Sequence, residues 1–143
     1  MSPPITLHNR QRGLPVELPA LQAFARRALE ACLRLPGKNA GELGRLDGVS
    51  VVLVSDRRMA ELHRRFLNVS GPTDVITFQH GEIFVSVETA RNQARRFGSS
   101  LEHEIRLYIA HGLLHLHGFD DNDAAGAVEM ERLQEKLVAA AAA

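Results

Sequence analysis

Runs of alternating and of continuous apolar residues mark the strands that this chain is expected to form. Residues 5–9 alternate apolar and polar side chains, as a half-buried strand does. Residues 49–54 are mostly β-branched and apolar, which is typical of a central strand covered on both faces. Two shorter runs, 75–78 and 83–87, are separated by a tight connection and therefore predict a hairpin.

Apolar residues that recur at every third or fourth position predict helices between these strands. The expected helices span residues 18–35, 56–67, 88–97, 101–117 and 122–138. In the second of them, Met59, Leu62 and Phe66 are expected to face the core, with arginines on the other side. The final five alanines, 139–143, are expected to form a frayed or disordered tail.

These elements together predict an α+β fold. We expect a small mixed sheet of about four strands faced by about five helices. The 143 residues fit one domain, 1–143, with one hydrophobic core, and the hydrophobic content of 45% excludes a chain that is disordered by composition.

The helix expected over 101–117 carries the clearest chemical signal. His111 and His115 lie four residues apart, which places both imidazoles on one helix face. Gly118 favours the left-handed conformation that ends a helix, and the chain can then return Asp121 toward the two histidines. Two imidazoles and one carboxylate leave a fourth position for water, which is the arrangement of a catalytic rather than a structural zinc site.

The identity of the third ligand has alternatives. Asp120 and Asp123 compete with Asp121, which is preferred because the spacing H-x-x-x-H-x-x-G-x-x-D matches metzincin-like sites, with Asp in place of their third His. His117 follows His115 by only two residues, so it is expected to point elsewhere, as a surface residue or as a support for a ligand. The plainer alternative, histidines that are only structural, is disfavoured by the ligand types and their spacing.

Position 112 argues against one class of zinc enzyme. Zinc peptidases of this spacing carry Glu directly after the first His, as the general base, whereas this chain has Gly112. A metal ion without that Glu can still polarise a phosphoryl or carbonyl oxygen. A metallopeptidase is therefore the less favoured hypothesis.

The zero net charge conceals an asymmetry along the chain. Residues 1–109 hold 15 Arg or Lys and 11 Asp or Glu, a balance of +4, whereas residues 110–143 hold 2 and 6, a balance of −4. Nearly all the cations are arginines, which contact phosphate in bidentate fashion. A basic body beside an acidic metal-bearing end is compatible with a nucleic-acid substrate. Arg64 and Arg65 are candidate phosphate contacts, with a solvated helix face as the alternative.

Composition also bears on the compartment. The single cysteine, Cys32, excludes an internal disulfide and lies in an apolar helical stretch, so it is expected to be a small core residue. The first residues lack a signal-peptide pattern, and the longest apolar runs are too short to cross a bilayer. We expect a soluble cytoplasmic protein without a membrane partner.

Three motifs give the chain a resemblance to a known family. They are Pro72-Thr73-Asp74-Val75, Gly81-Glu82, and the segment from His111 to Asp120. With these residues the chain resembles the YbeY family of bacterial metal-dependent endoribonucleases, from the first strand to the last helix. The resemblance implies one zinc ion per chain at positions 111, 115 and 121, and cleavage of single-stranded RNA. It also implies action on the 3′ end of small-subunit ribosomal RNA and a role in ribosome quality control.

Two positions depart from the family pattern. The third ligand is usually His and is here Asp121, which adds negative charge to the site. Many members have Arg at the position of Leu67 in this chain, and that Arg is a candidate phosphate contact. Here Arg64 or Arg65 would have to substitute for it.

Asp74 and the metal site itself each have two interpretations. Asp74 is a candidate proton acceptor or partner of a ligand histidine, although capping a turn before the strand is an equally good interpretation. A non-enzymatic ribosome-assembly factor, in which the metal only orders the acidic end, is the alternative to a nuclease, and Gly112 and Leu67 favour it somewhat.

Overall fold

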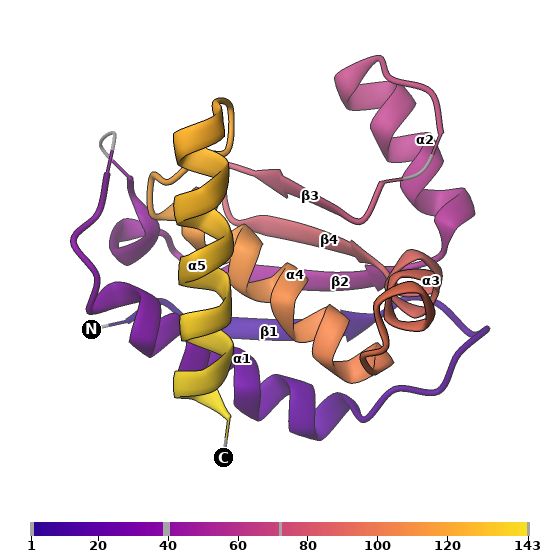
Figure 1. The fold of residues 1–143 in the computed structure, drawn as a ribbon, viewed down its shortest axis with the longest axis horizontal. Helices are drawn as coiled ribbons and strands as arrows, with labels where there is room; N and C mark the ends of the chain where they lie inside the picture. The colour runs from indigo at the N-terminus through magenta and orange to yellow at the C-terminus, as the bar shows by residue number, and fades with distance from the viewer. Residues whose placement is uncertain (1, 39–40, 72, 143) are drawn as a thin grey trace.

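The computed structural model describes residues 2–38, 41–71 and 73–142; Pro72 of the Pro-Thr-Asp-Val motif and Ala143 of the alanine tail lie outside them. The described strands form one mixed sheet in the order β1-β2-β4-β3. They are β1 (Ile5–Asn9), β2 (Val49–Val54), β3 (Val75–Phe78) and β4 (Glu82–Ser86). The predicted α+β class is confirmed, with a mixed sheet and a single small domain (Figure 1).

The sheet register follows from the apolar pattern of its strands. β2 pairs in parallel with β1 on one side and with β4 on the other, so it is central as predicted. β3 is antiparallel to β4 and joins it through a turn in which the Gly81 N–H donates to the Phe78 carbonyl (2.9 Å). Leu7, Val51 and Ile83 lie side by side in this register and are buried on the same face, here called the inner face.

Helices cover the inner face in two layers (Figure 1). α1 (Leu18–Leu33) and α4 (Leu101–Leu116) pack on the sheet, and α5 (Ala124–Ala141) packs on both of them. α3 (Val87–Phe97) follows β4 directly and contacts α4. The main core lies between these helices and the sheet, so α4 is held rigidly on both sides.

The opposite, outer face of the sheet is covered only in part, by α2 (Asp56–Leu67). The apolar cluster beneath α2 consists of Val54, Met59, Leu62 and Ile76. Met59 and Leu62 face inward as predicted, but the prediction for Phe66 is wrong, because its side chain is 54% exposed. Phe66 lies one turn beyond Leu62, past this cluster, where its ring meets the Phe78 ring edge-on at 5.5 Å and the Arg65 guanidinium lies over it at 5.5 Å.

The C-terminal alanines are also more ordered than predicted. α5 continues to Ala141, which is fully buried, and the Ala141 carbonyl accepts a hydrogen bond of 2.6 Å from Arg27 Nε on α1. Alanine has the highest helix propensity, so packing against α1 is sufficient to extend the helix. Among the described residues, no helix is both long enough and apolar enough to span a bilayer.

Candidate metal centre

The helix that carries His111 and His115, α4, has well-defined ends. Ser100 caps the N-terminus, with its Oγ accepting from the His103 N–H at 3.1 Å. At the C-terminus, Gly118 adopts φ +100°, a conformation that residues with a side chain rarely take. The chain therefore turns sharply and leads back over the last turn of α4.

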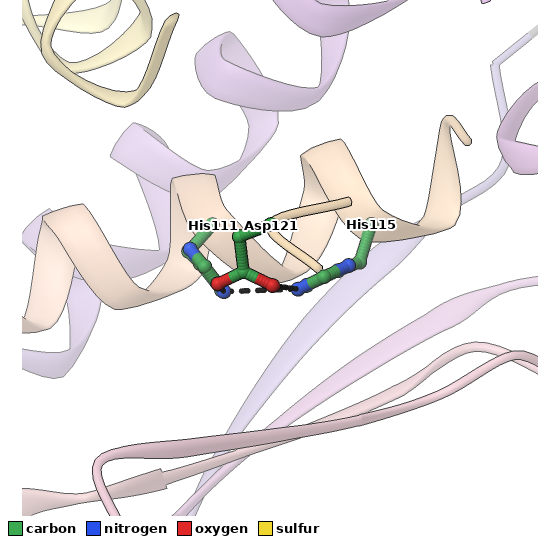
Figure 2. Close-up of side chains that lie close together, drawn as sticks. All are labelled: His111, His115 and Asp121. Atoms are coloured by element: carbon green, nitrogen blue, oxygen red, sulfur yellow. Dashed lines mark hydrogen bonds and ion pairs between the residues drawn. The ribbon is translucent and has the colours of Figure 1, made fainter. Parts of the chain in front are cut away.

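This turn brings together His111, His115 and Asp121, here called the His-His-Asp group (Figure 2). The two Nε2 atoms face each other at 2.9 Å. Asp121 lies above the pair, with Oδ2 at 3.7 Å from His111 Nε2 and Oδ1 at 3.7 Å from His115 Nε2. All three ligand atoms lie within 4.8 Å of one another, so the group can hold a metal ion.

The neighbouring aspartates have other partners. Asp120 Oδ1 accepts a hydrogen bond from the Asn122 N–H at 3.2 Å, which stabilises the turn. Asp123 is the N-cap of α5, with Oδ1 accepting from the Gly126 N–H at 2.7 Å. Within the described part of the chain, Asp121 is thus the carboxylate that joins the two histidines.

Hydrogen bonds behind the histidines orient their rings. Gln134 on α5 accepts from His111 Nδ1 at 2.5 Å, which leaves the lone pair of Nε2 directed at the group. His115 is hydrogen-bonded to the backbone of Phe119. Sequence analysis did not identify Gln134; the available signal was a polar residue one turn after Met130 on the apolar stripe of α5.

The donor set fits a divalent cation. Two nitrogen ligands on a tetrahedral zinc ion lie about 3.3 Å apart, given bonds of about 2.0–2.1 Å. The distances of 2.9, 3.7 and 3.7 Å in the His-His-Asp group bracket this value, so small side-chain rotations suffice. The Asp121 carboxylate also supplies negative charge where a cation would lie.

The protonation state of His115 suits a ligand. Burial, and secondarily the proximity of His111, lower the pKa of His115 below its ordinary value of 6.5, although Asp121 and Asp120 act in the opposite direction. The imidazole is therefore neutral at pH 7, and metal binding need not first displace a proton from it.

Packing of α4 on the sheet explains the glycine at position 112. Gly112 is buried, and a Cβ atom built on it would lie 2.7 Å from both Cδ1 and Cγ2 of Ile83 on β4. A side chain at 112 would therefore press into the sheet and could not serve the His-His-Asp group as a base. The contact with Ile83 therefore leaves no room at position 112 for the general-base glutamate of a zinc peptidase.

Gly112→Ala is expected to destabilise the protein by about 1–3 kcal/mol, because a buried methyl would overpack the interface with Ile83. In an exposed helix interior the same change would stabilise by about 1 kcal/mol. Urea unfolding of Gly112→Ala, Ile83→Ala and the double variant measures the coupling between them. Strictly additive effects would show that Ile83 is not the obstacle.

A cavity of about 510 Å³ opens beside His111. Asp74 Oδ1 accepts a hydrogen bond from the Val75 N–H at 2.8 Å, so Asp74 caps the turn before β3. Asp74 also lines the cavity. Tyr108 lines the same cavity; burial, followed by the carboxylates of Asp74 and Glu104, raises the pKa of its hydroxyl, which stays protonated.

Several other candidates lie away from the site. Arg64 and Arg65 are exposed in the last turn of α2, and the described residues that line the cavities beside His111 and His115 do not include them. His117 is buried rather than at the surface, with Nε2 2.7 Å from the Leu35 carbonyl oxygen. Cys32 is a core residue as predicted, and burial raises the pKa of its thiol to about 12, which makes it a poor nucleophile.

Comparison with known proteins shows which family this chain matches. The family model described as "Endoribonuclease YbeY" matches residues 6–142. A protein of that name from Moorella thermoacetica is 35% identical over 153 aligned positions, covering 94% of each chain. Its namesake from Thermus thermophilus is 38% identical and covers 80% of this chain and 86% of its own. A solution structure of TM1509 from Thermotoga maritima superimposes with a TM-score of 0.67 at 28% identity, covering 96% of this chain and 88% of that one.

Proposed function

Since this chain belongs to the YbeY family of endoribonucleases, we propose that it is a zinc-dependent hydrolase that cleaves single-stranded RNA. The observation that carries the proposal is the His-His-Asp group, in which three ligand atoms of the types zinc prefers converge on one point. When bound there, a zinc ion supplies Lewis-acid activation of a phosphodiester and of water.

The chain's own residues would hold and orient the reactants. His115 stays neutral, the hydrogen bond from Nδ1 to Gln134 fixes the direction of the His111 ring, and Asp121 balances the charge. Arg64 and Arg65, exposed at the end of α2, are the proposed contacts with backbone phosphates. We place the protein in the cytoplasm, where its substrate would be the 3′ end of small-subunit ribosomal RNA, in maturation and ribosome quality control.

Metal content and cleavage together test the proposal. Mass spectrometry of the purified protein is expected to find one zinc ion per chain. The protein is then expected to cleave an unstructured RNA, to lose that activity with a chelator, and to regain it when zinc is restored. A metal-free preparation that cleaves at the original rate would refute the proposal, and zinc binding without any cleavage would favour the assembly-factor alternative.

Asp74 is proposed as the acceptor of the proton released during attack, because it lines the same cavity as His111 and its orientation is fixed by the Val75 N–H. Asp74→Asn preserves an oxygen for that hydrogen bond, so the melting temperature is expected to stay unchanged. Cleavage is expected to fall by about 10²–10⁴-fold, the usual contribution of a general base. Full activity of Asp74→Asn would leave Asp74 with its capping role alone.

A further inference from the structure

The cavity beside His111 is poorly suited to hold RNA along its length. Its described lining contains one arginine, Arg96, against five carboxylates, which belong to Asp74, Glu104, Asp121, Glu131 and Glu135. A metal ion offsets this charge locally, but phosphates further along a strand would be repelled. Affinity for a polyanion must therefore come mainly from another surface.

The outer face of the sheet provides such a surface. Beyond the area that α2 covers, a groove of about 650 Å³ runs over β1, β2 and β4. Arg10 and Arg58 line it, together with His8. The groove also contains Glu82, whose Oε1 is hydrogen-bonded to His80 Nε2 at 2.6 Å. Arg58 contacts Glu61 at 3.2 Å with half of each side chain exposed, a weak pair that competes little with a phosphate.

Aromatic rings lie beside these cations. Phe84 lines the groove, and Phe78 lies next to it at 5.8 Å between ring centroids. Phe78 in turn stacks on the His80 ring at 5.9 Å with an interplanar angle of 20°. Phe66 meets Phe78 from the exposed end of α2. Sheet faces that carry aromatic rings among cations are platforms on which single-stranded bases stack.

The turn between β3 and β4 connects this surface to the His-His-Asp group. Gln79 lines the cavity that borders His115, whereas its neighbours Phe78 and His80 belong to the aromatic cluster of the outer face. β3 is one of the two edge strands of the sheet, and a strand of RNA that passes around this edge would reach both surfaces.

We propose that the groove on the outer face is a second RNA-binding surface, in which Arg10 and Arg58 hold phosphates and Phe84 and Phe78 stack bases of the single strand that flanks the cleaved bond. The inference rests on the proposed function in taking RNA as the substrate. It differs from that function in assigning affinity and cleavage to separate faces of the sheet.

The test compares binding and cleavage in groove variants and matched controls. The groove variants are Arg10→Gln/Arg58→Gln and Phe84→Leu. Arg26→Gln/Arg132→Gln removes the same charge from exposed positions on α1 and α5. Val128→Ala shortens an apolar side chain that is 68% exposed on α5 and is not part of the described lining of the cavities beside His111 and His115. Substrates are a labelled RNA of about 20 nucleotides and the dinucleotide UpU.

Each groove variant is expected to weaken binding of the long RNA about tenfold at about 0.1 M salt, measured by anisotropy with chelator present. In the double arginine variant, the slope of log K against log salt is expected to shrink by roughly 1.4, for two lost phosphate contacts. Cleavage of UpU by the zinc-loaded protein is expected to be unchanged, as are all values for the controls.

Equal binding by groove and control variants would overturn the inference while leaving cleavage, and hence the proposed function, intact. The inference would also fail if the groove variants lost a self-association seen in sedimentation but kept their affinity for RNA. Conversely, a wild-type protein that binds the long RNA through the groove but cleaves neither substrate would refute only the proposed function.

Discussion

His111→Ala is expected to abolish RNA cleavage while leaving the protein folded. The side chain of His111 is part of the His-His-Asp group, and its other contact, with Gln134, lies at the partly exposed edge of α5. Loss of one ligand in three should lower zinc affinity by more than about a hundredfold, since the loss of an outer partner alone typically costs about 10–100-fold. Zinc competition titration and RNA cleavage measure the two effects.

His103→Ala is the matched control, because His103 lies in the first turn of the same helix and takes no part in the group. Its zinc affinity and cleavage are expected to equal those of the original protein. Asp121→His, which restores the ligand that is usual in the family, is expected to bind zinc and to retain cleavage. Normal cleavage by His111→Ala would end the case for a metal centre at this place.

Gly118→Ala is expected to lower the free energy of unfolding by at least about 3 kcal/mol. Gly118 adopts φ +100°, and a Cβ atom there would lie 1.5 Å from the carbonyl oxygen of Lys38 and 2.5 Å from its carbonyl carbon. The segment around Lys38 is anchored on this turn, since the Lys38 N–H donates to the His117 carbonyl at 3.1 Å and Lys38 Nζ contacts Glu129 at 2.6 Å. Neither backbone can yield without moving the turn that carries Asp121.

Gly98→Ala measures the energetic cost of the left-handed backbone conformation without the steric clash that occurs at Gly118. Gly98 caps α3 with φ +69°, and a Cβ atom there would meet nothing within 4 Å. This variant should cost only about 1–2 kcal/mol, the penalty of the left-handed conformation. Urea unfolding gives both values, and zinc titration of Gly118→Ala is expected to show weaker binding. Equal costs at the two glycines would mean that the contact with Lys38 carries no energy.

Local patterns were sufficient for most of the secondary structure and for two of the three residues in the site. Alternation over 5–9 and the β-branched run over 49–54 predicted β1 and β2, because side-chain orientation in a strand depends only on neighbouring residues. The spacing of His111 and His115 placed both rings on one face of α4 for the same reason. Ser100 and Gly98, as helix ends, act within one turn of their own position.

Where distant segments meet, the same patterns were insufficient. The sequence favoured Asp121 over Asp120 and Asp123 only because its spacing resembles that of known metal sites. In the fold, Asp121 lies beside the two histidines, whereas Asp120 and Asp123 accept hydrogen bonds from backbone N–H groups. Phe66 continued the apolar stripe of α2 but lies past the cluster that α2 covers. The apolar pattern of a helix indicates which of its faces is buried, but not how far the apolar surface of the sheet beneath it extends.

The sequence by itself determined the elements, the histidine pair and the turn at Gly118, because each depends on backbone preferences and spacings within a few residues. Only the tertiary structure decided that Gly112 faces Ile83, that Gln134 orients His111, and that α5 continues to Ala141 against α1. These contacts join residues far apart in the chain, and their geometry is fixed by how whole helices pack on the sheet.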